Sequence, residues 1–137
     1  MTKPRSQILI VEAEEVIADI TAFRLELLGF DVNVASTGEK VNELLQARKP
    51  DLFIIDMQLP GISGLALIEQ VTASEATGKI PVIAISFDAN TDQVQQAFAA
   101  GAADYLVAPF DPLVLEEKVS NLIGTPSPAL RVGAARG

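Results

Sequence analysis

The chain has 137 residues, 49% of them hydrophobic, which fits one globular domain with a core of its own. It contains no cysteine and no histidine, so disulfides, thiol chemistry, Cys/His zinc sites and histidine bases are excluded; only oxygen-ligand metals such as Mg²⁺ remain. The net charge is −8, but residues 6–125 hold all 18 acidic and only six basic residues, so we expect no direct contact with nucleic acid.

The apolar segments are short, and the two ends of the chain differ from the middle. No apolar segment approaches the ~20 residues that a membrane span requires. Residues 1–6 are basic but lack the apolar segment of a signal peptide, so we expect a cytoplasmic protein without membrane contact. From Thr125 on, Pro, Ser, Gly and Ala dominate. We therefore expect a disordered tail at 1–6, one domain at 7–124, and a linker or disordered tail at 125–137.

A strand followed by an amphipathic helix is predicted five times along the chain. The continuous apolar run at 8–11 is typical of a parallel strand that is covered on both faces. A helix is expected at about 14–28, ended by Gly29. Its apolar residues at helical spacing are Val16, Ile17, Ile20, Phe23 and Leu27.

Residues 31–35 alternate weakly and predict a strand near an edge of the sheet. The next helix is expected at 38–48, with Val41, Leu44 and Leu45 facing inward.

The second half of the chain repeats this pattern. A third strand at 52–55 leads into Asp56, and Ser63 is a candidate N-cap for a helix that reaches about Glu75. A strand at 80–85, a helix at 91–100 and a short strand at 105–107 follow. Asp111 is expected to cap the last helix, with Pro112 at its first position. The inward residues of that helix are expected to be Val114, Leu115, Val119 and Leu122.

Five such units predict an α/β fold with a parallel sheet and helices on both faces. Sites in open sheets of this kind form outside the carboxyl ends of the strands. The residues that directly follow strands are therefore the candidates: Glu12, Ala13, Glu14, Asp56, Ser86 and Ala108.

Asp56 is the strongest of these candidates. A carboxylate that is partly desolvated at the sheet edge can act as a nucleophile or as a cation ligand. The alternative is that Asp56 caps the turn that follows it, which is common for an Asp at the end of a strand.

Four segments of the chain stand out when they are taken together: DMQLPGISG at 56–64, GAADYLVAPF at 101–110, and the apolar runs at 8–11 and 80–83. In this combination they resemble the response-regulator receiver domain of two-component signalling. The resemblance covers residues 7–123 in order and spacing. It implies a flavodoxin-like (βα)₅ three-layer sandwich with strand order 2-1-3-4-5.

The resemblance also implies roles for single residues. Asp56 matches the Asp that accepts a phosphoryl group from a histidine kinase or phosphotransfer protein, with Mg²⁺ bound. Glu12, Asp56 and the backbone carbonyl of Gln58 match the metal site, and Glu14 is a further candidate ligand. The alternative for Glu14 and its neighbour Glu15 is that both are first-turn acids favoured by the helix dipole.

Ser86 matches the hydroxyl residue that bonds the phosphoryl oxygen, and Tyr105 matches the switch aromatic. The alternative for Tyr105 is a half-buried strand aromatic with its hydroxyl in water.

Three positions depart from the family pattern. Ala13 replaces the acid that binds the metal directly, and Ala108 replaces the lysine that pairs with the phosphoryl group. Phe87 stands where a small residue is usual, and it would narrow access to Asp56 or cover it. The Ala108–Pro109 bond is expected to be cis, as in the family.

These losses predict Mg²⁺ binding that is weak or absent, and phosphorylation that is degraded or absent. Two functions follow. One is a phospho-accepting receiver in which Glu12, Glu14 or water replaces the missing ligands. The other is a pseudo-receiver, a protein interaction module that acts without phosphorylation.

The partner surface of the family is often helix four, strand five and helix five. Phe98, Tyr105 and the alanines between them would supply its apolar area, unless these alanines form a buried face. An enzyme is the least favoured function, because no acid–base pair, phosphate-binding glycine loop or nucleophile elbow is present.

Overall fold

The computed structural model describes residues 6–88 and 90–124. Five strands form one parallel sheet in the order β2-β1-β3-β4-β5, so the predicted edge position of the second strand is confirmed. The strands are β1 Gln7–Val11, β2 Asp31–Ala35, β3 Leu52–Asp56, β4 Val82–Ser86 and β5 Asp104–Val107. The tails predicted at 1–6 and 125–137 lie outside the described residues, apart from Ser6.

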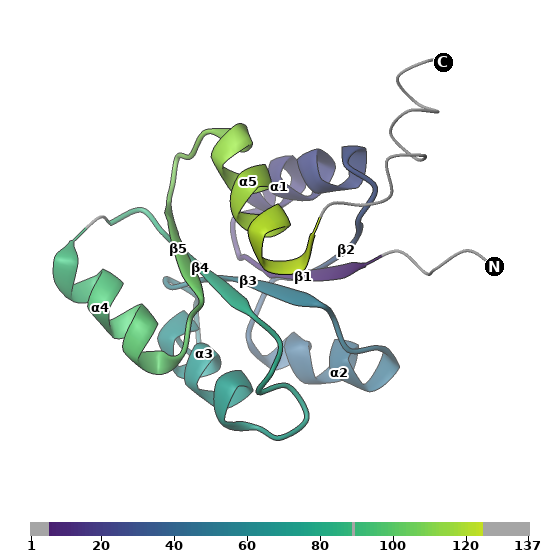
Figure 1. Ribbon diagram of the computed structural model, residues 1–137. Coiled ribbons are helices and arrows are strands. Elements are labelled where there is room, and N and C mark those ends of the chain that lie inside the picture. Colours follow the sequence, from purple (N-terminus) through teal and green to yellow (C-terminus); the bar gives the residue numbers. More distant parts are fainter. Residues whose placement is uncertain (1–5, 89, 125–137) are drawn as a thin grey trace, which may run out of the picture.

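Five helices cover the two faces of the sheet, which gives the predicted flavodoxin-like (βα)₅ sandwich (Figure 1). Helices α1 and α5 lie on one face, and α2, α3 and α4 lie on the other. The helices are α1 Glu15–Leu27, α2 Glu39–Ala47, α3 Gly64–Ala73, α4 Thr91–Ala100 and α5 Pro112–Ile123. Over the described ranges, none of them is long and apolar enough to cross a membrane.

The core is divided by the sheet into two layers, because successive strand residues point to opposite faces. On β3, Phe53 and Ile55 pack toward α2, α3 and α4, whereas Leu52 and Ile54 pack toward α1 and α5. All five residues of β1, β3 and β4 are buried. This explains why these strands appear in the sequence as continuous apolar runs.

Local signals in the sequence set several helix ends as predicted. The side chain of Ser63 accepts a hydrogen bond from the amide of Ala66, and that of Asp111 accepts one from Leu113. Pro112 occupies the first turn of α5. Gly29 has a φ of 100°, a left-handed conformation that favours glycine after a helix.

Most of the apolar residues that recur at helical spacing along α1 do not face the sheet. Val16, Ile20, Phe23 and Leu27 are 69%, 55%, 60% and 60% exposed, respectively. The buried residues are Ala18, Thr21 and Leu25. The helix has apolar residues on two opposite sides, and helical periodicity alone does not say which side meets the sheet.

The prediction for α5 is partly wrong. Leu115 and Val119 are fully buried as expected, but Val114 is 40% exposed. Leu122 is partly buried against the same core. On α2, Val41 is buried, and Leu44 and Leu45 pack partly buried against the core as predicted.

Candidate functional site

Asp56 ends β3 and is 3% exposed, so its carboxylate lies at the carboxyl edge of the sheet in a largely desolvated position. Its Oδ1 accepts a hydrogen bond of 2.9 Å from the amide of Gln58. Asp56 therefore caps the turn that follows it, as the alternative interpretation expected.

After the loop that follows Asp56, Gly64 lies close to the backbone of Asp56 and Met57. A Cβ atom added to Gly64 would lie 1.9 Å from the carbonyl oxygen of Asp56 and 2.6 Å from the Cα of Met57. Only glycine allows this approach, and the amide of Gly64 donates to the carbonyl of Met57 at 3.3 Å. The start of α3 thereby fixes the position of Asp56.

Glu12 lies beside Asp56. Val11 of β1 pairs with Ile55 of β3, so the next residue of each strand, Glu12 and Asp56, comes to the same place at the sheet edge. The carboxyl group of Glu12 is 3% exposed and shares a hydrogen bond with Asp56. Burial, and then the hydrogen bond and the charge of Asp56, raise the pKa of Glu12 from its ordinary value of 4.5 to about 8. At neutral pH this pair therefore holds a proton.

The other predicted metal ligand does not join this pair. Glu14 is exposed, and its backbone amide, not its side chain, contacts the site by donating to Oε2 of Glu12 at 3.1 Å. Within the described part of the chain, no three acidic side chains converge on a point where they could hold a metal ion. Mg²⁺ prefers ionised oxygen ligands, so its binding here would require Glu12 to release its proton.

Ser86 ends β4, next to Asp56, and its side chain is fully buried. Its hydroxyl lies 3.2 Å from the amide oxygens of both Gln58 and Gln93, and it accepts a hydrogen bond from the amide of Asp88. The amide nitrogen of Gln58 also donates to Gln93 at 3.3 Å. Two glutamines therefore close over the hydroxyl.

Gln93 was missed by the sequence analysis. It lies in the first turn of α4, and no motif distinguishes it from the neighbouring glutamines at 95 and 96.

Tyr105 is 8% exposed, and its hydroxyl donates a 2.8 Å hydrogen bond to the backbone carbonyl of Asp88. The alternative of a hydroxyl in water is therefore wrong. Because its ring is buried, Tyr105 does not contribute apolar area to the expected partner surface. Of the alanines between Phe98 and Tyr105, Ala102 is buried, whereas Ala99 and Ala103 are exposed, as is Phe98 at 45%.

Of the positions that depart from the family pattern, Ala13 is exposed, and Phe87 and Ala108 lie beside α1. The Ala108–Pro109 bond is cis, as predicted. Ala108 is 4% exposed, and its amide donates to the carbonyl of Ser86. Phe87 is 53% exposed and lines a hollow with Ala108 and Ile20.

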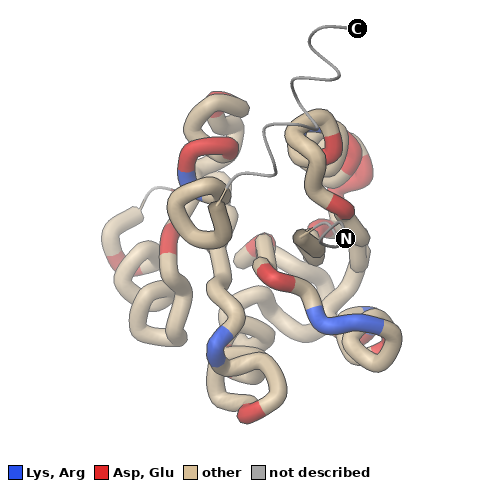
Figure 2. The backbone as a smooth tube through the Cα atoms, turned by 45° about the vertical axis from the view of Figure 1, so that its right-hand side comes forward, with Lys and Arg blue, Asp and Glu red and all other residues tan. Residues whose placement is uncertain are grey.

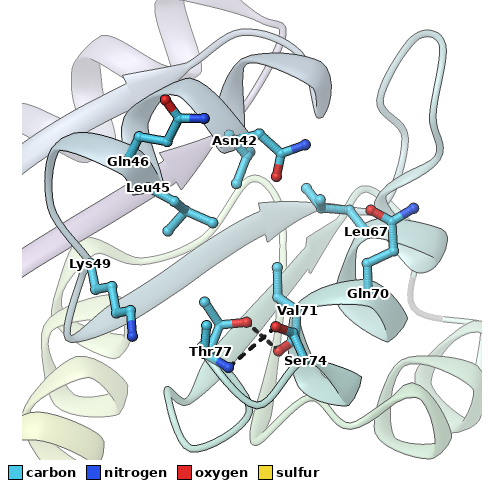
Figure 3. Close-up of a pocket in the computed structure, with 11 residues that line it drawn as sticks. Asn42, Leu45, Gln46, Lys49, Leu67, Gln70, Val71, Ser74 and Thr77 are labelled. Atoms are coloured by element: carbon cyan, nitrogen blue, oxygen red, sulfur yellow. Dashed lines mark hydrogen bonds between the residues drawn. The ribbon is translucent and has the colours of Figure 1, made fainter.

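A second hollow, of about 490 Å³, lies away from these residues, between α2 and α3 (Figure 3). Leu45 points into it from α2, and Leu67 and Val71 line it from α3. The hydroxyl of Thr77 donates to the carbonyl of Val71 at its lower rim. None of the candidate site residues lines this hollow.

Comparison with known proteins agrees with the observed fold. Residues 8–120 match the family model of the response regulator receiver domain. The chain belongs to this family. It is 32% identical over 122 residues to the phosphate regulon transcriptional regulatory protein PhoB of Rhizobium meliloti, which covers 89% of this chain and 54% of that protein. The receiver domain thus spans about half the length of the curated relatives that it matches.

Two solved receiver domains have the same fold over most of their length. One, from a DNA-binding response regulator of Colwellia psychrerythraea, gives a TM-score of 0.81 at 28% identity, with 86% of this chain and 98% of that chain covered. The other belongs to the sensor histidine kinase PA1611 of Pseudomonas aeruginosa and holds a magnesium ion in its active-site cleft. It gives a TM-score of 0.80 at 26% identity, with 88% of this chain and 99% of that chain covered.

Proposed function

We propose that this receiver domain acts as a pseudo-receiver, a signalling module that binds protein partners without being phosphorylated at Asp56. The observation that carries the proposal is that alanine stands at positions 13 and 108, beside the buried Glu12–Asp56 pair. Burial raises the pKa of Glu12 to about 8, so a divalent cation would have to displace a proton from Glu12 in order to bind there.

Charge arithmetic supports the same conclusion. Phosphorylation would replace the single charge of Asp56 with about −2. The residues at positions 13 and 108 are both alanine, so neither a third carboxylate for the metal nor a lysine for the phosphoryl group is supplied. A charge contact at ~4 Å is worth up to ~4 kcal/mol at an effective dielectric constant of ~20.

Phosphoryl transfer depends almost wholly on positioning and on charge neutralisation. A deficit of about 3–5 kcal/mol would slow the transfer roughly 10²–10⁴-fold.

The second candidate is a phospho-accepting receiver, and one observation favours it. Asp56 and Ser86 are both retained at the ends of neighbouring strands, with Asp56 paired to Ile85 in the register. Here Glu12, Glu14 or water would replace the missing ligands, and a histidine kinase or phosphotransfer protein would be the donor. Ser86 would first have to leave the amide oxygens of Gln58 and Gln93.

A phosphodonor experiment separates the two candidates. The protein is incubated with Mg²⁺ and acetyl phosphate, and in parallel with beryllofluoride, and is followed by intact mass and by NMR. We expect no stable phosphoryl adduct and little spectral change. An adduct of one phosphoryl group on the native protein that is absent from Asp56→Asn would overturn the pseudo-receiver proposal.

The proposal places the domain in the cytoplasm and assigns its output to a protein partner. The relatives named above include transcriptional regulators, and the receiver domain covers about half of their length. The described body has 18 acidic and six basic residues (Figure 2), so contact with DNA would come from another domain or another chain.

A further inference from the structure

The hollow of about 490 Å³ between α2 and α3 lies on the face of the sheet that α1 and α5 do not cover (Figures 1 and 3). Small-molecule sites in proteins occupy roughly 300–1,000 Å³. A helix about 10 Å across fills roughly 120 Å³ per residue, so this space would hold only about four helical residues. The size of the hollow therefore favours a small molecule over a protein helix.

The floor of the hollow is apolar and belongs to the core. Val41, Leu67 and Val71 are 1%, 3% and 5% exposed, and Leu45 points into the space from α2. All four pack in the core layer between the sheet and helices α2, α3 and α4. Because cores are close-packed, the hollow could not collapse without disturbing that layer. The apolar surface is therefore formed before a ligand arrives.

The turn between α3 and β4 forms a further wall of the hollow. The hydroxyl of Thr77, which is 4% exposed, donates to the carbonyl of Val71 at 2.6 Å, and its amide donates to the carbonyl of Ser74 at 3.3 Å (Figure 3). The carbonyl of Thr77 accepts a hydrogen bond of 3.0 Å from the amide of Ile80. These bonds fix the turn, so the hollow has a defined boundary on this side.

Side-chain amides line the hollow from both helices. Asn42 and Gln46 belong to α2, and Gln70 belongs to α3. Among residues 6–88 and 90–124, these three side chains have no hydrogen-bond partner, so their donors and acceptors are available to a ligand. A few polar groups around an apolar floor are typical of a small-molecule site.

The charge of the hollow is opposite to that of the chain. Lys49 lines it from the turn after α2, and none of the other lining residues is charged. Within the described ranges Lys49 forms no ion pair, and the carboxylate of Asp51 accepts from the amide of Gln7 at 2.7 Å. The chain carries a net charge of −8, so it repels anions in general but offers an ammonium group here.

We propose that this hollow binds a small carboxylic acid with a compact apolar body, of the aryl or branched alkyl class. The body lies on Leu45, Leu67 and Val71, and the carboxylate pairs with Lys49. The amides at the rims bond to polar substituents of the ligand. This inference goes beyond the proposed function, because it gives the domain a small-molecule ligand whether or not Asp56 is phosphorylated.

The probe is 2-naphthoate, compared with the neutral 2-naphthamide and the cationic 2-naphthylmethylamine. Binding to the whole chain is followed by NMR amide shifts. We expect saturable shifts within residues 41–49 and 67–77, with a dissociation constant of about 1 mM or lower for naphthoate and about threefold or more weaker binding of the other two. Equal binding of all three, shifts confined to other residues, or no saturation with naphthoate would overturn the proposal.

Variants test the two parts of the hollow. Lys49→Gln should weaken naphthoate binding about threefold or more and leave naphthamide binding unchanged. The matched control Lys79→Gln removes another exposed lysine, which does not line the hollow, and should change naphthoate binding less than about 1.5-fold. Gln46→Trp fills the hollow and should weaken both ligands about tenfold or more.

Lys49, Lys79 and Gln46 are exposed, so these variants should fold. No loss of naphthoate binding with Lys49→Gln, or an equal loss with Lys79→Gln, would refute the pairing with Lys49. Unchanged binding in Gln46→Trp would refute the hollow as the site.

Sedimentation velocity examines the alternative occupant. A native dimer that dissociates in Gln46→Trp would show that a second copy occupies the hollow, and it would overturn the proposal. The naphthoate assay contains no phosphodonor. Phosphorylation of Asp56 would therefore refute the proposed function without altering the naphthoate result, and failure of the naphthoate assay would leave the phosphodonor result intact.

Discussion

Glu12 and Asp56 share a hydrogen bond at the ends of the neighbouring strands β1 and β3. Each side chain is 3% exposed, so two ionised carboxylates at this place would repel each other with little screening by water. A proton held on Glu12 removes one of these charges and lets Glu12 donate to Asp56. The pair thus carries one negative charge instead of two.

The stability of the protein should depend on pH through Glu12. Its pKa is raised from 4.5 to about 8 by folding, so the folded state binds more protons than the unfolded state between these values. The contribution of Glu12 is complete below about pH 4.5, is lost as pH rises, and is gone above about pH 8. Each pH unit costs at most ~1.4 kcal/mol. Urea unfolding at pH 5, 6, 7 and 8 measures this loss.

The variant Glu12→Gln is the control for that measurement, because it keeps the size and hydrogen-bonding ability of the side chain without the titration. We expect its unfolding free energy to be nearly flat over the range in which that of the native protein falls. A native profile that stays parallel to the Glu12→Gln profile would show that Glu12 is ionised at neutral pH.

Restoring the missing charged groups should restore metal binding. The double substitution Ala13→Asp, Ala108→Lys adds one carboxylate and one cation at the sheet edge. The hollow beside Ala108 leaves space for the longer side chain. We expect Mg²⁺ affinity, measured by calorimetry, to rise at least about tenfold. The neutral pair Ala13→Asn, Ala108→Met should bring no such gain. If the charged pair brings none either, the assignment of the two lost positions is wrong.

Gly64 should tolerate no side chain. A Cβ atom would lie 1.9 Å from the carbonyl oxygen of Asp56, and backbone on both sides has to move to admit it. We expect Gly64→Ala to reduce the unfolding free energy by roughly 2–4 kcal/mol. Gly124→Ala is the comparison, since nothing lies within 4 Å there and its cost is that of backbone strain alone, at a φ of 79° and a ψ of 170°. Similar losses in both variants would refute the close approach at Asp56.

The hydroxyl of Tyr105 should order the loop between β4 and α4, because it is hydrogen-bonded to the carbonyl of Asp88 in that loop. Tyr105→Phe removes the hydrogen bond to the carbonyl of Asp88, and we expect a loss of about 1 kcal/mol in stability. The amide of Asn90, which is bonded to the Asp88 side chain, should exchange faster with solvent. Tyr105→Leu also removes buried ring atoms and should cost ~1–2 kcal/mol more. Unchanged exchange at Asn90 in both variants would show that the hydroxyl does not order the loop.

Most of the fold was predictable because its signals are local. The apolar runs at β1, β3 and β4 indicate strands covered on both faces, and Ser63 and Asp111 cap the helices that they precede. The orientation of α1 was not predictable in this way. The helix has apolar residues on both sides, and contact with the sheet selects the side with small residues at Ala18 and Thr21.

The candidate site was likewise predictable only in part. Strand ends place Glu12, Asp56 and Ser86 at one edge of the sheet, and this follows from the order of the elements. Gln93 could not be found, because its contact with Ser86 depends on how α4 is set against the sheet. The exposure of Glu14, the buried hydroxyl of Tyr105 and the placement of Phe87 beside Ile20 depend likewise on packing between elements.

The sequence by itself determined the family, the parallel sheet and the absence of a carboxylate at Ala13 and of a lysine at Ala108, because periodicity and residue identity are written along the chain. Only the tertiary structure decided that burial and Asp56 raise the pKa of Glu12, and that Ile20 and Phe23 of α1 face outward. The physical reason is that proton affinity and exposure depend on which atoms surround a side chain, and residues distant in sequence supply those atoms.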